Sequence, residues 1–395
     1  MVGEYVWDTK VIRTQKRCGK EKQREKKEDT FHLFMRLIPI KINIFLIFNE
    51  RYLQTLDIQR YMKKLFFLFL LAGTVAASFV SCAPRIPETK KGIMDAFVAG
   101  TLDPSYAPAA FFIHFGNDQK VGDAAVQAHL KYFRESDMDI LKVQFEQTVP
   151  RIPAGEENAF EPIPEDFYRP TLEIIASLQE AEGKDVYVLP TIYSTYQVAR
   201  QSLGENRIKA AAKENPEFLK AVFNAYRDAL LWLIKECKKA GILGFYMCTQ
   251  GGEMTFNEIP GFFETFIRDY DLAVMGECTR DTKMNILHIC NWEGPYEDLT
   301  RYKDYPAQII NTPLDLNGVP FTLQDGIDLF GRPVLGGFDR KGSFNTLSAE
   351  EVTAEAHAIL KANPASRVMI GADCTVGSAP LANIQAAVAA AHGAK

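Results

Sequence analysis

Short, almost continuously apolar runs alternate with longer amphipathic stretches from residue 110 to the end of the 395-residue chain. Strands that are buried on both faces, as in a parallel sheet covered by helices, have this composition. Eight strands with helices between them favour a single α/β domain with the (β/α)8 fold, the TIM barrel. The pattern predicts these strands at 110–115, 139–145, 185–192, 241–249, 284–290, 307–312, 333–339 and 367–373.

The segments between the predicted strands carry apolar residues every three or four positions, which is the period of an amphipathic helix. The clearest are 122–136 and 216–241, and the second ends at a glycine, a common helix stop. Ser348 followed by Glu351 predicts a capping box at the start of another helix. A doubly wound open sheet is the alternative fold. It usually has fewer strands, and no glycine-rich phosphate loop follows the first predicted strand here.

An export signal precedes the predicted barrel. Residues 62–83 read MKKLFFLFLLAGTVAASFVSCA, with two lysines, an apolar run and small residues before a cysteine. We therefore expect a bacterial signal peptide at 62–81, cleaved before Cys82, which stands where a lipoprotein has its lipidated residue. A short membrane anchor is the alternative. Residues 1–61 are interpreted as upstream read-through or disordered sequence, or else as a basic cytoplasmic tail, and 82–395 as the barrel.

Charge and cysteine content limit the partners of this exported chain. From Cys82 onward it has 30 Lys and Arg against 42 Asp and Glu, a formal net charge of −12. Such a surface disfavours nucleic acid, which requires a basic patch. The later cysteines are odd in number and irregularly spaced, so they do not indicate a disulfide framework. Burial, a metal or chemistry must account for these thiols, which are Cys237, Cys248, Cys278, Cys290 and Cys374.

The carboxyl ends of the predicted strands carry most of the candidate functional residues. In a TIM barrel the loops at this end form the active face. Polar and metal-binding residue types concentrate there, while the strand interiors are apolar, and this distribution predicts an active site. The residues at these ends are His114, Gln144, Glu146, Tyr193, Cys248, Gln250, His288, Cys290, Asn311, Asp339, Arg340, Asp373 and Cys374.

Three of these residues could hold a metal ion. The stretch NILHICNWEG places His288 and Cys290 two positions apart, so that both side chains point to the same face of a strand. Cys374 ends the last predicted strand, and the loops converge above the barrel. One imidazole and two thiolates suit zinc, and an exchangeable fourth position marks a catalytic site. The alternative is that these are core side chains, because cysteine is among the most buried residue types.

The motif HIC, followed downstream by GADCTVGSAPLANIQAAVAAA, resembles the uroporphyrinogen decarboxylase superfamily. It is most similar to the zinc-dependent branch, the methylcobamide:coenzyme M methyltransferases. The stretches 122–146 and 333–356 fit the same superfamily, so the resemblance covers essentially all of 86–395. The resemblance implies the barrel fold and gives the zinc-ligand role to His288, Cys290 and Cys374.

The chain departs from the family pattern at two positions. The family usually has glycine after its His-x-Cys, and this chain has Asn291. A carboxylate associated with the following strand end is replaced near Asn311, with Asp315 slightly beyond. The fourth ligand therefore stays open between water, Asp315, Glu293 and the substrate.

The resemblance implies a methyl- or alkyltransferase in which zinc activates the thiol of a small-molecule acceptor. A corrinoid or a corrinoid protein would be the possible methyl donor. The residues expected to shape the substrate pocket are His114, Glu146, Tyr193, Gln250, Asn311 and Asp339.

Two other functions stay open. A metal-free decarboxylase-like lyase of the same superfamily would bind a tetrapyrrole with many carboxylates, but the decarboxylase's N-terminal arginine-rich motif is absent from this chain. A non-catalytic lipoprotein that binds a small molecule or a corrinoid would fit the predicted export, to the periplasm or the outer membrane. Corrinoid and coenzyme M chemistry belongs to the cytoplasm, so motif and predicted compartment disagree.

Overall fold

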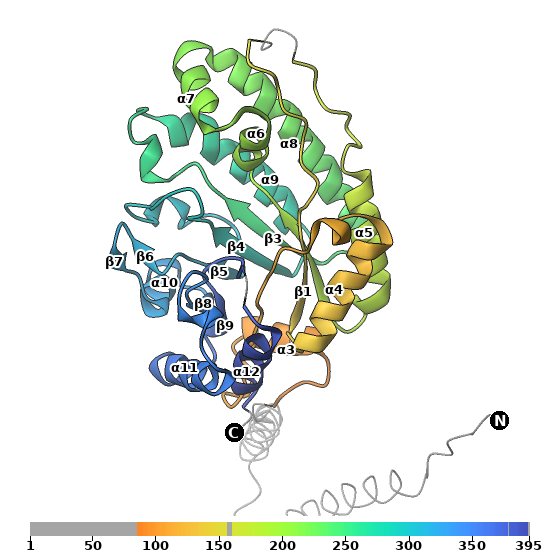
Figure 1. Ribbon diagram of the computed structural model, residues 1–395, viewed down its shortest axis with the longest axis vertical. Coiled ribbons are helices and arrows are strands. Elements are labelled where there is room, and N and C mark those ends of the chain that lie inside the picture. The colour runs from red at the N-terminus through yellow and green to blue at the C-terminus, as the bar shows by residue number, and fades with distance from the viewer. Residues whose placement is uncertain (1–84, 156–159, 378, 394–395) are drawn as a thin grey trace, which may run out of the picture. The chain divides into compact units, whose positions relative to one another are not determined.

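The strands of the central sheet are all parallel and lie side by side in chain order, β1-β2-β3-β4-β5-β8-β9 (Figure 1). The computed structural model describes residues 85–155, 160–377 and 379–393. Seven of the eight predicted strands form in it. They are β1 Ile140–Val143, β2 Tyr187–Ile192, β3 Gly244–Thr249, β4 Met284–Ile289, β5 Ile309–Asn311, β8 Val334–Phe338 and β9 Val368–Ala372.

The segment 108–112 joins the two ends of this sheet. On one side it bonds to β9, where the Ala110 amide donates to the Ile370 carbonyl at 2.9 Å. On the other side the Asp139 amide, just before β1, donates to the Ala109 carbonyl at 3.0 Å. The sheet therefore curls into a ring with an eighth position, as the TIM-barrel prediction requires.

The predicted strand 110–115 is wrong as a regular strand, because the nearest bridge is an isolated one that joins the preceding residue, Ala109, to Ile370. Side chains take the backbone groups that a ladder would need. The Phe111 amide donates to the Met138 sulfur at 2.9 Å, and the Tyr132 hydroxyl donates to the Phe111 carbonyl at 3.0 Å. With these groups occupied, ordinary strand pairing cannot continue along the segment.

Helices alternate with the strands and cover the outer face of the ring (Figure 1). Ser348 accepts a hydrogen bond from the Glu351 amide and so forms the predicted capping box. A short antiparallel hairpin, β6 Asp315–Leu316 with β7 Val319–Pro320, lies in the connection before α10. The helices are α3 Lys90–Val98, α4 Gly122–Ser136, α5 Arg169–Glu182, α6 Thr195–Leu203, α7 Glu205–Glu214, α8 Pro216–Lys239, α9 Asp269–Thr279, α10 Leu323–Phe330, α11 Ala349–Ala362 and α12 Leu381–Ala391.

A buried carboxylate fastens the amino-terminal end of the barrel. Asp139 is fully buried and accepts hydrogen bonds from the Tyr106 hydroxyl at 2.6 Å and the Ala109 amide at 2.7 Å. The His392 ring, just after α12, lies 2.9 Å from the same carboxylate and stacks on Tyr106. The start of β1 is thus tied to both ends of the described chain, at the barrel face opposite the loops that follow the strands.

The predicted signal peptide at 62–81, Cys82 and the segment 1–61 lie outside the described residues. The described residues belong to one compact unit, Ala83–Lys395. None of the helices that the structure describes is long and apolar enough to span a membrane.

Candidate metal centre

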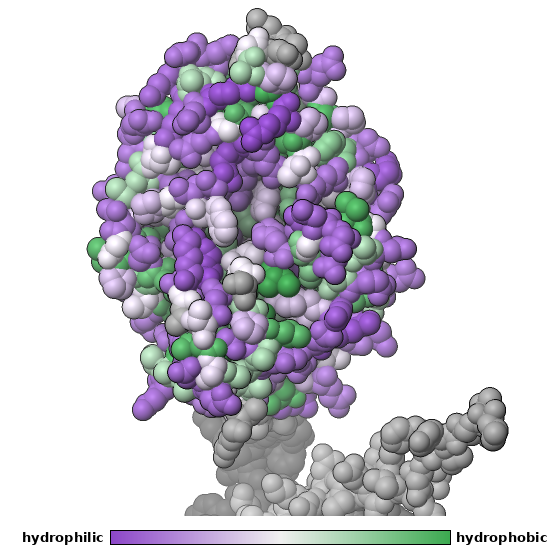
Figure 2. Space-filling model, in the orientation of Figure 1, coloured by the Kyte–Doolittle hydropathy of each residue, from purple (hydrophilic) through white to green (hydrophobic). Residues whose placement is uncertain are grey.

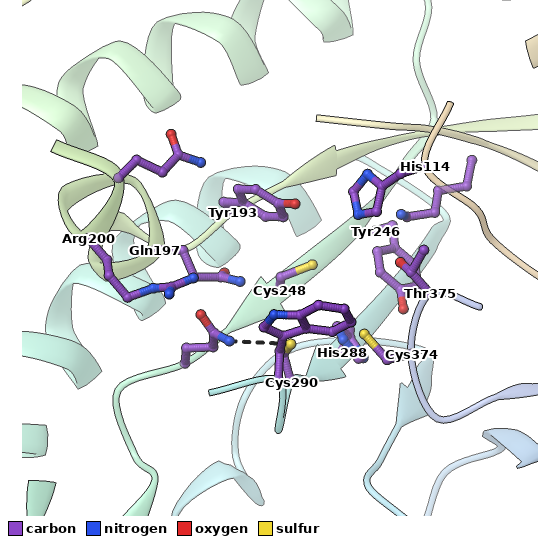
Figure 3. Close-up of a pocket in the computed structure, with 14 residues that line it drawn as sticks. His114, Tyr193, Gln197, Arg200, Tyr246, Cys248, His288, Cys290, Cys374 and Thr375 are labelled. Atoms are coloured by element: carbon purple, nitrogen blue, oxygen red, sulfur yellow. Dashed lines mark hydrogen bonds between the residues drawn. The ribbon is translucent and has the colours of Figure 1, made fainter. Parts of the chain in front are cut away.

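A cavity of about 270 Å³ opens at the carboxyl ends of the strands. The molecular face in Figure 2 is hollowed near its centre, and Figure 3 shows the side chains that surround the space. Among the residues that the structure describes, no aspartate or glutamate lines it, although histidine, thiol, amide and cationic groups do. The lining residues are His114, Lys142, Tyr193, Gln197, Arg200, Gln201, Tyr246, Cys248, Gln250, His288, Cys290, Trp292, Cys374 and Thr375.

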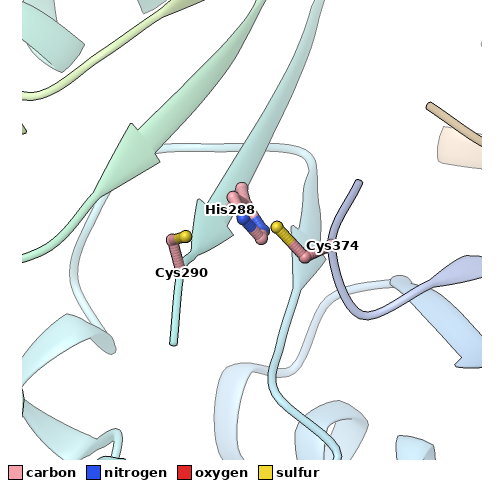
Figure 4. A group of neighbouring side chains, drawn as sticks. All are labelled: His288, Cys290 and Cys374. Atoms are coloured by element: carbon pink, nitrogen blue, oxygen red, sulfur yellow. The ribbon is translucent and has the colours of Figure 1, made fainter. Parts of the chain in front are cut away.

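His288, Cys290 and Cys374 form a buried cluster in this cavity (Figure 4). His288 lies in β4, Cys290 directly follows that strand, and Cys374 is the second residue after β9. The ligand atoms of all three residues lie within 4.8 Å of one another. The alternation of side chains along β4 brings the first two together, and the convergence of strands at the barrel mouth adds the third.

Neighbouring side chains hold His288 and Cys290 in place. The His288 ring stacks on Tyr246, with centroids 5.5 Å apart and an angle of 28° between the planes. The Cys290 sulfur accepts a hydrogen bond from the Gln250 amide at 3.4 Å. Cys248 on β3 is the register partner of His288 and lines the same cavity. Its side chain therefore faces the same side of the sheet as the cluster.

The electrostatics of the two clustered thiols favour one thiolate. The hydrogen bond from Cys290 lowers the pKa of Cys374 well below its usual value, and His288 and Arg340 act in the same direction. The same hydrogen bond and burial raise the pKa of Cys290 well above its usual value. The hydrogen bond therefore favours the anionic form at Cys374 over Cys290.

The cluster fits a zinc ion. The Nδ1 atom of His288 is buried without a hydrogen-bond partner, as expected of a ring nitrogen with another role. Ligand atoms of tetrahedral zinc lie roughly 3.4–3.8 Å apart, so small side-chain shifts from the present separations would suffice. One imidazole and two sulfurs match the soft-ligand preference of zinc, and the cavity leaves room for a fourth ligand.

Neither candidate for a fourth ligand joins the cluster. Asp315 is exposed on the β6–β7 hairpin, where it accepts a hydrogen bond from the Gly318 amide at 2.8 Å. Glu293 pairs with Arg200 at 2.5 Å. Among the described residues, the group of possible metal ligands contains only the histidine and the two cysteines. A metal held by the cluster would therefore take its fourth ligand from water or from the substrate.

The predicted pocket residues divide into two groups. His114, Tyr193 and Gln250 line the cavity. Glu146 does not; it pairs with His114 at 2.8 Å and with Lys120 at 3.2 Å, and lines a second cavity of about 220 Å³. It therefore acts on the site through His114.

Asn311 and Asp339 also lie outside the cavity lining. Asn311 is fully buried and accepts a hydrogen bond from the Tyr246 hydroxyl at 2.8 Å. Its amide donates to the carbonyls of Leu335 and Ala372, so it fastens β5 to β8 and β9. Asp339 accepts a hydrogen bond from the Lys341 amide at 2.8 Å within its own loop.

Several lining residues were not predicted from the sequence, and Lys142 is the most unusual of them. Lys142 lies in β1, is 9% exposed, and donates a hydrogen bond to Gln144 at 2.7 Å. A lysine within an otherwise apolar run, two positions before a glutamine on the same strand face, is a signal that could have found it. The other missed lining residues are Gln197, Arg200, Gln201, Tyr246, Trp292 and Thr375.

Comparisons with known proteins show the fold. No protein-family model and no curated protein matches the sequence. A solved methyltransferase from Methanosarcina mazei is similar, with a TM-score of 0.61 at 15% identity, over 76% of this chain and 98% of that one. A B12-independent methionine synthase from Shewanella sp. W3-18-1 has a TM-score of 0.47 at 12% identity, over 73% and 97%. Of these two likenesses, the first is close enough to establish a shared fold.

Proposed function

We propose that this protein is a zinc-dependent methyl- or alkyltransferase of the uroporphyrinogen decarboxylase superfamily, with a thiol as the acceptor. The observation that carries the proposal is the buried His288, Cys290 and Cys374 cluster, which faces a cavity at the active end of the barrel. The fold shared with the Methanosarcina mazei methyltransferase supports it. The residues of the sequence motif that resembles the zinc-dependent branch are the residues of this cluster.

The residues of the cluster would supply three ligands and leave the fourth position to the acceptor. Zinc bound there lowers the pKa of a thiol ligand and orients it, which is the chemistry that a metal supplies in such a site. Gln250 holds Cys290 through its hydrogen bond, and the Tyr246 ring holds His288. Burial raises the pKa of Tyr193, so its hydroxyl stays a neutral hydrogen-bond donor inside the cavity.

The proposed reaction forms one bond and breaks one. The acceptor sulfur attacks the methyl carbon, the carbon–donor bond breaks, and the donor keeps the electron pair. The proton of the acceptor thiol passes to solvent when the thiol binds. Corrinoids suit the donor role because cobalt accepts an electron pair readily, and we propose a corrinoid or a corrinoid protein as the donor.

The cavity supports a small acceptor over a tetrapyrrole. Its volume of about 270 Å³ is near the lower end of the range for small-molecule sites, roughly 300–1,000 Å³. A polycarboxylate substrate would need free arginines. Arg200 is the arginine among the lining residues, and it already pairs with Glu293. These features favour a thiol transferase over a decarboxylase-like lyase.

The first test is the zinc content of the purified, reduced protein and of its Cys290→Ser and Cys374→Ser variants. We expect one equivalent in the wild type and a loss of at least ~ten-fold in affinity in each variant, because each removes a thiolate ligand. Cys248→Ser is the matched control, since Cys248 is a buried thiol of the same cavity outside the cluster. Wild-type protein that binds no zinc after reconstitution would overturn the proposal.

A second test measures transfer itself, with methylcobalamin as donor and 2-mercaptoethanol as acceptor. Loss of the methyl group from the corrinoid gives an absorbance change, and mass spectrometry detects the methyl thioether. We expect both signals in the zinc-loaded wild type and neither in Cys290→Ser. A zinc-loaded protein that binds the thiol but transfers no methyl group from any corrinoid would favour the binding lipoprotein instead.

A further inference from the structure

A buried ammonium group faces the candidate metal centre. Lys142 in β1 lines the same cavity as the cluster and is 9% exposed. Its Nζ atom lies 5.0 Å from the centroid of the Phe112 ring and 4.7 Å from that of Tyr246. The Gln144 side-chain oxygen accepts its hydrogen bond at 2.7 Å. Two ring faces and an amide oxygen all favour the charged form, but none carries a negative charge.

The other basic side chains near this cavity already have carboxylate partners. Arg200 pairs with Glu293, and His114 and Lys120 both pair with Glu146. Within the described part of the chain, no carboxylate lies within ion-pair distance of Lys142. A buried charge without a partner is costly, so it is retained where it compensates a charge that another molecule or state brings.

The groups whose negative charge would act on Lys142 are the three cavity thiols and one carboxylate, Glu146, which already pairs with His114 and Lys120. Burial lowers the pKa of Lys142, and Coulomb attraction to Cys248, Cys374, Glu146 and Cys290 opposes that shift. Conversely, Lys142 is the group that lowers the pKa of Cys248 against burial, which raises it to about 12. Lys142 therefore lies close enough to act on every thiol of the cavity.

A charge count shows when this ammonium matters most. Zinc with two thiolates and a neutral imidazole is neutral, and a third thiolate makes the centre negative by one charge. We propose that the Lys142 ammonium is the counter-charge that offsets this third thiolate, so that a thiol acceptor enters the cavity as its anion. The inference rests on the function proposed above and adds a positioning residue that acts through charge.

A metal-free experiment tests the charge effect without relying on the proposed function. In reduced, zinc-free protein, iodoacetamide alkylates thiolates: the sulfur displaces iodide and forms a thioether. Peptide mass spectrometry follows Cys248 in the wild type, Lys142→Met, Lys142→Arg and Lys341→Met. Lys341 is an exposed lysine after β8, so the last variant loses the same net charge outside the cavity.

We expect Lys142→Met to slow alkylation of Cys248 at neutral pH by roughly ten-fold or more, because the nearby positive charge is gone. Lys142→Arg should keep the rate within roughly three-fold, since it keeps the charge, and Lys341→Met should match the wild type. Thermal melting identifies any variant that fails to fold, in which case the arginine variant is compared with Lys142→Gln. Equal rates in the wild type and the neutral variants would overturn the inference.

A second experiment uses protein loaded with Co²⁺, in which thiolate binding gives a charge-transfer band. 2-Mercaptoethanol, which is neutral apart from its thiol, and 3-mercaptopropionate, which has an anionic tail, are titrated separately. We expect Lys142→Met to weaken the binding of both thiols by a similar factor, roughly ten-fold. Weaker binding of 3-mercaptopropionate alone would show that Lys142 binds the carboxylate of the substrate and would overturn the counter-charge role. Failure of the wild type to bind Co²⁺ would instead count against the proposed function.

Discussion

Arg340 and Asp373 form an ion pair that is almost completely buried, with 2% and 5% of their side chains exposed. Asp373 directly precedes Cys374, and it also accepts a hydrogen bond from the Arg340 amide at 2.8 Å. The same guanidinium donates to the Asn291 side chain at 2.8 Å, and Asn291 directly follows Cys290. One arginine therefore fixes both chain segments that carry the clustered cysteines.

This arrangement predicts that Arg340→Met lowers both stability and metal retention. Removal of one partner leaves a buried carboxylate unpaired, which costs about 3–5 kcal/mol. The two cysteine segments also lose their common anchor, so zinc should dissociate faster from the variant. Urea unfolding of the metal-free protein measures the first effect, and zinc transfer to a colorimetric chelator measures the second.

Lys220→Met is the control for this prediction. Lys220 pairs with Glu217 at 2.9 Å in an exposed position, and such pairs contribute about 1 kcal/mol or less. Unfolding of Arg340→Met at the same urea concentration as this control would contradict the structural role of the buried pair.

A second prediction concerns Asn311 in β5, the register partner of His288 in the candidate metal centre. Asn311→Ala removes three hydrogen bonds and leaves the Tyr246 hydroxyl without its acceptor. We expect a loss of about 3 kcal/mol or more in the free energy of unfolding, with one zinc still bound per chain. Asn224 is exposed on α8, so Asn224→Ala should change stability by only about 0.5 kcal/mol. Loss of zinc without loss of stability in Asn311→Ala would show a direct role at the site instead.

Most of the strand pattern could be predicted from the sequence, because a strand buried on both faces must be apolar along its whole length. The segment 110–115 shows where this reasoning fails. Ala110, Phe111 and Phe112 are buried, as a strand's residues would be, but the Met138 sulfur and the Tyr132 hydroxyl occupy the backbone groups of Phe111. Such side-chain bonds come from residues whose positions only the folded structure specifies.

The site shows the same division between local and tertiary information. Strand alternation was enough to bring His288 and Cys290 to one face, because that geometry is local. Asp339 and Asp315 were expected near the site, but their orientation depends on loops, and each bonds within its own loop or hairpin. Lys142 was missed because its run was read for hydrophobicity alone, although strand alternation places it on the same face as Gln144.

A third prediction concerns the segment before the barrel. We propose that residues 62–81 are removed and that Cys82 is lipidated, because two lysines, an apolar run and small residues precede this cysteine, as in a lipoprotein signal. Mass spectrometry of the protein from a bacterial membrane fraction should find an amino-terminal Cys82 carrying acyl chains. Cys82→Ala should abolish the lipid. Wild-type protein in the soluble fraction that keeps residues 1–81 and carries no lipid would contradict this prediction.

The last prediction follows from Glu253, whose carboxyl group is buried in the loop after β3. Its side chain is buried, with 1% of the residue exposed. One carboxyl oxygen accepts a hydrogen bond from the Gly251 amide at 2.6 Å, and the other oxygen has no hydrogen-bond partner. Burial raises its pKa from 4.5 to about 7, while Arg200 opposes and Glu205 adds to the shift. As pH rises above 4.5 the unfolded chain loses this proton but the folded protein keeps it, so stability must fall until about pH 7.

Glu253→Gln should therefore flatten the loss of stability between about pH 5 and 7, where one such group contributes about 1.4 kcal/mol per pH unit at most. Burial raises the pKa of Asp271 to about 8, which adds a decline in stability of the same sign. The stability of the double variant with Asp271→Asn should therefore depend even less on pH.

Urea unfolding at half-unit pH steps measures the stability of both variants, with the exposed Glu297→Gln as control. A slope in Glu253→Gln as steep as in the wild type would show that Glu253 is already ionised in the folded protein at pH 5. Its unpartnered oxygen would then need a cation that binds in the loop after β3.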